Sequence, residues 1–497
     1  MMFHFEYWGL ALTLLYGLFT LILYSIIAVI KGTFFKSLTE REKLELVLGT
    51  TARDRFWNLS KQWTGLSHGF ITLKNGFKIH YVTNDGRERI AHRASDKPLV
   101  IFLHGFPDSW AIWRHVLSSS SIRESSTVVA ADLPGYGGSD SLEKYGATEV
   151  LEALTEFILA IREKCGVDTE QGNHQRKVIL VTHDWGAVLA FRLASEAPQL
   201  ADRFIMINGP LVCFSFQSHA VRLLTLRQVS LMKSNMHLLT ESSAKMFKTF
   251  IREPWRSRFL LLKSIRTWMS VLRQLWLSGY IFAFQLPMPF VRYMGTGGNY
   301  SFLKAVHKIS VGTADQFTIR DAQESMASTL GPGKKEYETQ TENNETYPSS
   351  VLQREKYGNF GDLASYYRDG AAAGIWHKSL ETISSLFNIG TEEPRRTSSG
   401  TGVFDLDRGS LRANATILWG KSDVAIDTHL ALEGIADYLV HGSQLIVLPR
   451  SGHFPQVEVE SRAALEKVLE WAVRGEKGDI ASMVRSEYPD AKLVLQK

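Results

Sequence analysis

Residues 178–197 have the sequence VILVTHDWGAVLAFRLASEA, in which a short apolar run is followed directly by helical spacing. A continuous apolar run of this length is typical of a parallel strand that is buried on both faces. A sharp turn from such a strand into a helix requires small residues two positions before and two positions after its apex. Thr182 and Gly186 occupy those positions. We therefore expect Asp184 at the apex, with an ordinary helix N-cap as its alternative role.

Similar apolar runs and helical patterns alternate on both sides of this stretch. Apolar runs lie at residues 98–103, 127–131, 204–207, 415–419 and 445–448, and helical patterns lie at 148–164, 428–440 and 460–474. We expect an edge hairpin over residues 69–84 around Asn75-Gly76, and Thr148 is the candidate N-cap of the first helix. This alternation predicts an α/β fold in which a mostly parallel sheet has helices on both faces.

Residues 8–30 carry no charged side chain over a length that can span a bilayer as a helix. The basic start and small-residue cleavage site of a signal peptide are not present. We therefore expect an N-terminal transmembrane helix, with a buried core helix as the alternative. No Lys or Arg precedes the run, and several follow it, namely Lys31, Lys36, Arg41 and Lys43. This asymmetry predicts that the remaining chain faces the cytosol. The expected localisation is that of a single-pass membrane protein of the endoplasmic reticulum.

The strand and helix alternation stops between about residues 211 and 410, where aromatic-rich helical patterns dominate. We interpret this part as a helical lid inserted into the sheet domain. Two polar stretches within it, residues 331–350 and 389–403, offer almost nothing to bury and are expected to be disordered. The expected organisation is a membrane anchor (1–31), a connector (32–68), the first part of the sheet domain (69–210), the lid (211–410) and the second part of the sheet domain (411–497).

Composition excludes some classes of function. The formal net charge is +5 on 497 residues, and no dense Lys/Arg run is interleaved with aromatic residues, so we expect no nucleic-acid partner. Two cysteines, Cys165 and Cys213, cannot build a disulfide framework, and they lack the C-x-x-C spacing of metal or redox sites. This cysteine content agrees with a reducing compartment.

Three polar residues follow apolar runs in the order nucleophile, acid, histidine, which is the order found in α/β-hydrolases. They are Asp184, Asp423 and His453. An earlier run ends in His104-Gly105-Phe106-Pro107, whose Phe106 N–H would form an oxyanion hole with the N–H of Trp185. Each residue taken alone is more often an ordinary loop residue, and their order along the chain favours the catalytic interpretation.

Five motifs resemble those of the epoxide hydrolases of the α/β-hydrolase fold, and the membrane-anchored epoxide hydrolase 3/4-like branch is the most similar. These motifs are HGFPDSW (104–110), DLPGYGGSD (132–140), THDWGA (182–187), LWGKSD (418–423) and GHFPQ (452–456). The resemblance covers roughly residues 65–475 apart from the polar insertions. It implies an α/β-hydrolase fold with an inserted lid, in which Asp132 has a structural part in the loop after a strand.

The family also has a pair of lid tyrosines that bind the epoxide oxygen. Its Y-x-x-x-F/H-Q pattern fits Tyr280 five residues before Gln285, and its late Tyr-Arg pair fits Tyr367-Arg368, with Tyr366 as the alternative. The resemblance implies that Asp184 attacks an epoxide carbon and forms an alkyl-enzyme ester. The two tyrosines would stabilise and protonate the departing oxygen.

The second implied step is hydrolysis of that ester. His453, supported by Asp423, would activate water, while the N–H groups of Phe106 and Trp185 hold the oxyanion. The expected reactants are a small lipophilic epoxide and water, the product is a vicinal diol, and neither a metal nor an organic cofactor is required.

Two other functions remain as alternatives. A haloalkane dehalogenase shares the Asp-Trp elbow, although such enzymes often have Asn where this chain has Phe106, and they need no tyrosine pair. A non-catalytic lipid-binding protein on the same fold would require a blocked lid. The absence of a serine at the elbow argues against a serine esterase.

Overall fold

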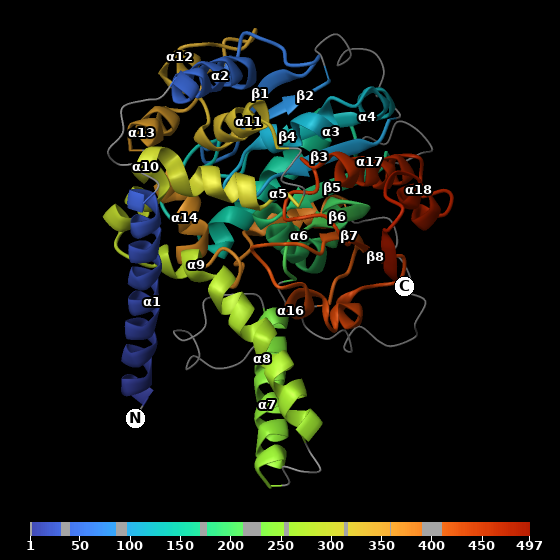
Figure 1. Cartoon of the computed structure of the whole chain (residues 1–497). Helices are drawn as coiled ribbons and strands as arrows, with labels where there is room; N and C mark the ends of the chain where they lie inside the picture. Colours follow the sequence, from blue (N-terminus) through green and yellow to red (C-terminus); the bar gives the residue numbers. More distant parts are fainter. Residues whose placement is uncertain are drawn as a thin grey trace.

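The predicted strands form one sheet at the centre of the molecule (Figure 1). The computed structural model describes residues 2–30, 40–85, 97–168, 176–211, 230–252, 258–312, 317–357, 359–389 and 410–497. Its strands are β1 (Ser67–Thr72), β2 (Lys78–Thr83), β3 (Leu99–Leu103), β4 (Thr127–Ala131), β5 (Val178–His183), β6 (Arg203–Ile207), β7 (Asn414–Gly420), β8 (Gln444–Leu448) and β9 (Lys492–Gln496). Their order across the sheet is β1-β2-β4-β3-β5-β6-β7-β8-β9.

The middle of this sheet is parallel, from β4 through β3, β5, β6 and β7 to β8. The hairpin β1–β2 joins one edge through an antiparallel pairing of β2 with β4, and β9 pairs antiparallel with β8 at the other edge. Every residue of β3, β4, β5, β6 and β8 is buried, as expected for continuous apolar runs. The predicted open, mostly parallel sheet is therefore confirmed. Only the short, partly exposed β9 is missing from the predicted strands.

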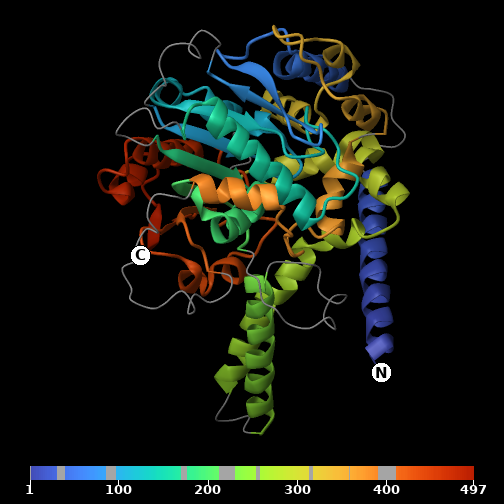
Figure 2. The ribbon, with the colours of Figure 1, turned by 180° about the vertical axis from the view of Figure 1, so that it is seen from behind.

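Helices cover both faces of the sheet (Figures 1 and 2). The alternate residues Leu99, Ile101 and Leu103 of β3 belong to one core cluster, together with side chains of α5 (Ala147–Lys164) and α6 (Trp185–Glu196). Val100 and Phe102 belong to a second cluster. That cluster includes side chains of α3 (Arg114–Leu117), α4 (Ser120–Ser125), α17 (Val459–Val473) and α18 (Ile480–Glu487). Successive residues of a strand point to opposite faces, so this division places one core on each side of the sheet.

Two helix boundaries differ from the prediction. Helix α5 begins at Ala147 with Gly146 as its N-cap residue. Thr148 is therefore not the cap, and its hydroxyl oxygen instead accepts a hydrogen bond from the His377 N–H at 3.0 Å. The helix expected over residues 428–440 is divided into α16 (Thr428–Leu432) and a 3-10 helix (Ile435–Tyr438). Gly434 between them has a φ of +76°, a left-handed conformation that ends α-helices.

Between β6 and β7 the described residues contain helices and no strand. These helices are α7 (Ser230–Arg252), α8 (Arg258–Leu277), α9 (Gly279–Ala283), α10 (Met288–Ile309), α11 (Ile319–Leu330), α12 (Lys334–Tyr337), α13 (Ser349–Tyr357), α14 (Phe360–Arg368) and α15 (Leu380–Ile389). Helices α7 and α8 pack side by side and project from the body (Figures 1 and 2). The assignment of residues 211–410 as a lid, and the other domain boundaries, stay predictions.

The expectation of disorder over residues 331–350 is wrong. This stretch includes α12 and packs against α2 (Glu40–Trp57). Tyr347 is buried and its hydroxyl donates to the carbonyl of Trp57 at 2.6 Å, while the Thr339 hydroxyl accepts from the Leu59 N–H at 3.0 Å. A polar stretch is ordered here because distant residues satisfy its polar groups and cover the ring of Tyr347. In the second expected disordered stretch, all residues after 389 lie outside the described part of the chain.

Helix α1 (Met2–Ile30) projects from the same side of the molecule as α7 and α8 (Figures 1 and 2). Residues 10–30 reach a mean hydropathy of 2.3, and 17% of the most apolar window is buried. The small buried share argues against a core helix. By length and composition, α1 is the one helix among the described residues that can cross a membrane.

Candidate active site

Asp184 lies at the sharp turn between β5 and α6. Its backbone has a φ of +48° and a ψ of −116°, a conformation that non-glycine residues keep only where the surrounding packing enforces it. The packing here is tight enough to exclude side chains at two neighbouring glycines. A Cβ on Gly186 would lie 2.5 Å from the carbonyl oxygen of His104, and a Cβ on Gly209 would lie 2.9 Å from that of Asp184. The turn expected from the sequence is therefore present, with Asp184 at its apex.

The Asp184 carboxylate points into a cavity, and its side chain keeps 13% of its accessible surface. The backbone N–H of Phe106 donates to its Oδ1 at 2.6 Å. Gly105 lies so close to both the carboxylate and the Trp185 nitrogen that any side chain there would collide with them. Trp185 is the first residue of α6, so its N–H has no partner within the helix. Two backbone donors thus lie beside the carboxylate.

His453 lies between two carboxylates that come from different strand ends. Its Nε2 is 3.5 Å from Asp184 Oδ2, and its Nδ1 is 2.8 Å from Asp423 Oδ2. Asp423 is fully buried, and its Oδ1 accepts from the N–H groups of Ala425 at 2.7 Å and Ile426 at 3.0 Å. The structure therefore brings the three residues expected from the order of the motifs into direct contact.

Opposing effects set the charge of His453. Burial lowers the pKa of its imidazole, but the Asp423 and Asp184 carboxylates outweigh burial and raise that pKa to about 10. Burial likewise raises the pKa of the Asp423 carboxyl, and the charge and hydrogen bonds of His453 and Asn208 bring this pKa below its usual value. The free protein therefore holds His453 as a cation at neutral pH.

Tyr280 on α9 and Tyr367 on α14 line the same cavity as Asp184 and His453. Their ring centroids are 5.9 Å apart, and the ring of Phe106 lies 6.5 Å from the first and 5.5 Å from the second. Burial raises the pKa of both phenols, and the Asp184 charge raises each further. Both hydroxyls therefore keep their protons and remain hydrogen-bond donors.

The neighbouring Tyr366 points away from the cavity. It is buried, and its hydroxyl donates to the carbonyl of Pro134 at 2.9 Å. Gln285 donates from Nε2 to the carbonyl of Tyr367 at 3.2 Å, and the Arg368 guanidinium donates to two carbonyls of the segment that follows α9. These bonds tie the two tyrosine-bearing segments together.

The cavity has a volume of about 280 Å³. Its polar groups are concentrated at Asp184, His453 and the two tyrosines, and most of the remaining lining is apolar. These apolar side chains come from α1, α8 and α10 and from the loop after β7. A cavity with a few convergent polar groups in an apolar wall fits a compact lipophilic ligand.

Comparison with known proteins agrees with this arrangement, since residues 100–338 match the alpha/beta hydrolase family. The chain has the α/β-hydrolase fold. It is 35% identical to epoxide hydrolase 3 of Mus musculus over 151 residues, which cover 29% of this chain and 36% of that protein. It is 33% identical to epoxide hydrolase 4 of Mus musculus over 145 residues, which cover 29% of this chain and 35% of that protein. The resemblance to epoxide hydrolases of the 3/4 type is therefore confirmed, and the chain spans about a third of the length of these relatives.

Solved structures of bacterial epoxide hydrolases also resemble the chain. The Cif epoxide hydrolase from Acinetobacter nosocomialis aligns with a TM-score of 0.49 and 16% identity, over 88% of this chain and 97% of that one. An epoxide hydrolase from Bacillus megaterium aligns with a TM-score of 0.44 and 22% identity, over 82% of this chain and 99% of that one.

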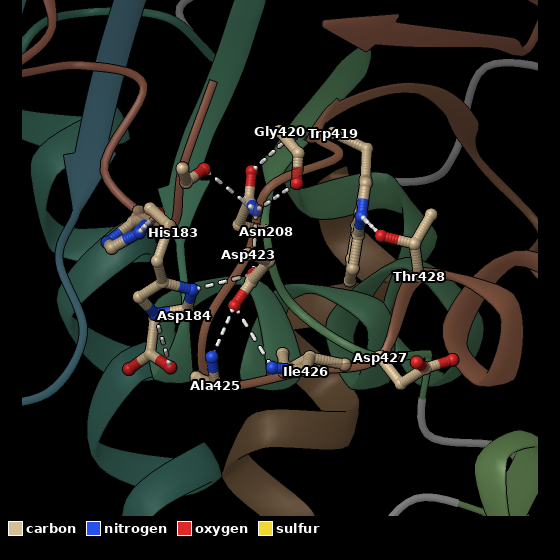
Figure 3. Close-up of polar contacts among 12 residues, drawn as sticks. His183, Asp184, Asn208, Trp419, Gly420, Asp423, Ala425, Ile426, Asp427 and Thr428 are labelled. Carbon is tan, nitrogen blue, oxygen red and sulfur yellow. Dashed lines mark hydrogen bonds and ion pairs between the residues drawn. The ribbon is translucent and has the colours of Figure 1, made fainter. Parts of the chain in front are cut away.

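Asn208 is a residue of this site that the sequence interpretation did not single out. Its Nδ2 donates to Asp423 Oδ2 at 2.7 Å, and its Oδ1 accepts from the Gly420 N–H at 2.9 Å (Figure 3). Its φ is +43°. An Asn-Gly-Pro sequence directly after the apolar run 204–207 was the available signal, because such residues tolerate positive φ at strand ends.

One group of described residues, His115, Asp321 and Glu324, has ligand atoms close enough together to hold a metal ion. Glu324 already forms ion pairs with Arg55 at 2.5 Å and with Arg114 at 2.9 Å. Two neighbouring guanidinium groups repel a metal cation, so we interpret this group as an ion-pair network between α2, α3 and α11.

Proposed function

We propose that the chain is an epoxide hydrolase that converts lipophilic epoxides to vicinal diols through a covalent ester on Asp184. The observation that carries the proposal is one apolar cavity lined by the Asp184 carboxylate, the His453 imidazole and the hydroxyl-bearing rings of Tyr280 and Tyr367. A carboxylate nucleophile and a pair of acidic donors are the groups that opening of an epoxide requires. The similarity to named epoxide hydrolases supports the same reaction class.

In the first step an Asp184 carboxylate oxygen attacks an epoxide carbon. The carbon–oxygen bond breaks, its electron pair passes to the oxygen, and Tyr280 or Tyr367 donates a proton to that oxygen. Both phenols keep their protons in the free protein because burial raises the pKa of each. A departing alkoxide is more basic than a phenolate, so it still takes the proton.

Formation of the ester also changes the state of His453. One of the two carboxylates that raise its pKa to about 10 loses its charge when Asp184 is alkylated, so the pKa of the imidazole falls. The imidazolium then gives up its proton, which restores the tyrosine. Neutral His453 is left beside the ester, still oriented by its 2.8 Å contact with Asp423.

In the second step His453 removes a proton from water, and the resulting hydroxide attacks the ester carbonyl carbon of Asp184. The N–H groups of Phe106 and Trp185 stabilise the oxyanion. Collapse of this intermediate breaks the ester bond, and the proton of the newly added hydroxyl passes to the departing diol oxygen, which leaves Asp184 as a carboxylate. The products are the diol, the Asp184 carboxylate and protonated His453, so the cycle closes with one water consumed and no cofactor.

The test is intact-mass spectrometry of the full-length His453→Gln protein after mixing with a lipophilic epoxide. Alkylation does not need the base, so this variant should gain the mass of one substrate molecule and keep it. The matched control is the double variant with Asp184→Ala, which should gain no mass. An active wild-type protein whose His453→Gln variant forms no adduct would contradict the two-step scheme.

The same fold and elbow would serve a haloalkane dehalogenase, which needs halide donors instead of a tyrosine pair. In this chain Tyr280 and Tyr367 lie with Phe106 in one ring cluster of the cavity. The tyrosine pair therefore favours epoxide hydrolysis over haloalkane dehalogenation. Diol formation from a panel of lipid and styrene-type epoxides, with halide release from haloalkanes measured in parallel, separates the two activities.

We further propose that α1 anchors the protein in the membrane of the endoplasmic reticulum, with the hydrolase domain in the cytosol. The length and hydropathy of α1 support the anchor. The basic residues that follow Ile30, with no Lys or Arg before the run, support the cytosolic orientation.

A further inference from the structure

Helix α1 is one wall of the cavity that holds Asp184. Tyr16, Phe19, Thr20 and Leu23 of this helix line the cavity together with the catalytic groups. Their spacing of three and four residues places them on a single face of α1. A helix that served only for attachment would have no need of a face directed at the reacting groups.

Specific contacts hold α1 in this position. The Tyr16 hydroxyl donates to the carbonyl of Leu275 at the end of α8 at 3.1 Å, and the Tyr24 hydroxyl lies 2.7 Å from the Ser301 hydroxyl of α10. Gly17 packs directly on α9, where a Cβ would lie 2.5 Å from a backbone carbonyl oxygen. The wall is therefore fixed to the three helices that border the cavity.

The rim of the cavity is apolar and exposed. Phe19, Trp276 and Ile309 all line it and keep 52%, 65% and 59% of their accessible surface. They come from α1, α8 and α10. Further exposed apolar side chains of the same two projecting helices, α1 and α8, are Leu12, Leu15, Leu262, Met269 and Leu272. Exposed apolar surface of this extent marks a contact with lipid or with another protein.

Charge and position favour lipid. Helix α8 carries no acidic residue, and its basic residues Lys263 and Arg266 are exposed among apolar and aromatic ones. A third basic residue, Arg273, forms an ion pair with Asp427 at 3.5 Å. This composition is typical of helices that lie against anionic lipid headgroups. Helices α7 and α8 project from the same side of the molecule as α1 (Figures 1 and 2). A bilayer that contains α1 therefore reaches the exposed rim.

We infer that the cavity opens into the bilayer between α1 and α8, so that the substrate enters from the membrane and its chain lies along the Tyr16–Leu23 face of α1. This inference rests on the proposed function, because it describes how the epoxide reaches Asp184. It assigns a specificity-determining role to α1. The epoxides that suit this route have long apolar chains, since these partition into lipid and can extend from the cavity into it.

The first experiment compares the same substitution on two faces of α1. Leu23→Trp places a larger side chain on the cavity wall and so reduces the space inside the cavity. Leu15→Trp lies on the exposed face of α1, where 63% of the Leu15 surface is accessible. In proteoliposomes, Leu23→Trp should lower kcat/KM for a long-chain fatty-acid epoxide by about tenfold or more, and for a styrene-type epoxide much less. Leu15→Trp should change neither value.

The styrene-type activity shows that each variant is folded. An equal response of the two variants to the long-chain epoxide would overturn the role of α1. A wild-type protein that hydrolyses neither epoxide would instead overturn the proposed function.

The second experiment tests whether the rim faces lipid. A nitroxide is attached at Trp276→Cys, and a control nitroxide at Val494→Cys, which lies on the exposed edge strand β9. Both are made in a background without Cys165 and Cys213 and are reconstituted in vesicles. The label at residue 276 should be relaxed more by oxygen, which partitions into lipid, than by a water-soluble nickel chelate. The label at residue 494 should be relaxed more by the chelate than by oxygen. Chelate access at residue 276, or shielding from both reagents by a protein partner, would overturn the opening into the bilayer.

Discussion

The charge of His453 is the property of a single residue on which the proposed cycle depends most directly. Asp423 and Asp184 raise its pKa to about 10 in the free protein, against the effect of burial. Alkylation of Asp184 removes one of those charges, so the pKa of His453 in the ester is lower. Because only neutral His453 can activate water, ester hydrolysis should slow about tenfold for each pH unit below that lowered pKa. Alkylation should keep its rate over the same range, since it uses no base.

Single-turnover measurements of adduct formation and decay across pH would separate these two steps. The Asp423→Asn variant should shift the decay profile to lower pH, because it removes the remaining carboxylate that favours the cation. Adduct decay that does not respond to pH while formation does would contradict the assignment of His453 as the base.

The adjacent tyrosines offer a second prediction about single residues. Tyr280→Phe or Tyr367→Phe should each slow alkylation by about 100-fold, because one donor to the departing oxygen is lost. The double variant should be nearly inactive. Tyr366→Phe should keep the alkylation rate but lose about 1 kcal/mol of stability, since it removes only the buried bond to the Pro134 carbonyl. Rapid-mix mass spectrometry and thermal unfolding measure the two effects. An inactive Tyr366→Phe protein with an active Tyr367→Phe protein would show that the assignment is wrong by one residue.

Individual site residues differ in how far the sequence could predict them. Asp184, Asp423 and His453 each follow a buried strand within a recognisable motif, and parallel strands bring their carboxyl ends to one edge of the sheet. Their meeting at one site could be expected for that reason. The role of Asn208 could not be expected, because it depends on the packing of its amide against Gly420, the last residue of β7, and Asp423, which follows that strand far along the chain.

At the level of helices, the contact between α1 and α9 determines where Tyr280 lies. Gly17→Val should separate the two helices, since any Cβ at this position would come within 2.5 Å of the α9 backbone. Tyr280 would then move, and alkylation should slow by about tenfold or more. Ala11→Val on the same helix is the matched control, because Ala11 is exposed and away from the cavity. Alkylation rates in proteoliposomes would decide, and equal rates for the two variants would exclude a positioning role for α1.

Strands and helices were predictable to the extent that their burial is periodic in the sequence. The fully buried strands β3–β6 and β8 appear as continuous apolar runs, so their positions could be predicted closely. The order in residues 331–350 could not be predicted, since it comes from contacts with α2 nearly 300 residues earlier, such as Tyr347 with Trp57. Strand β9 (Lys492–Gln496) was not predicted, because an edge strand that is partly exposed has no continuous apolar run.

On the scale of the whole molecule, the topology relative to the membrane can be tested without any substrate. Asn344 belongs to an Asn-Glu-Thr acceptor sequence, and it is exposed, in a turn where its φ is +61°. If the part of the chain after α1 lay in the lumen, Asn344 would therefore receive an N-glycan. The basic flank of α1 predicts a cytosolic domain, so the native chain should carry no glycan. The second acceptor, Asn58, is partly buried and binds Asp54 at 2.9 Å, which makes it a poorer reporter.

Endoglycosidase treatment with a gel shift, and protease protection of intact microsomes, measure this topology. The native chain should not shift and should be digested without detergent. A chain directed into the lumen by a cleavable signal peptide in place of α1 is the positive control, and its Asn344 should be glycosylated because the site is accessible. A glycan on Asn344 of the native chain would show that the topology is the reverse of the predicted one. Protection of the chain after α1 from protease until detergent is added would show the same. The basic face of α8 would then meet the lumenal leaflet instead of the anionic cytoplasmic one, and its attraction to the membrane would be lost.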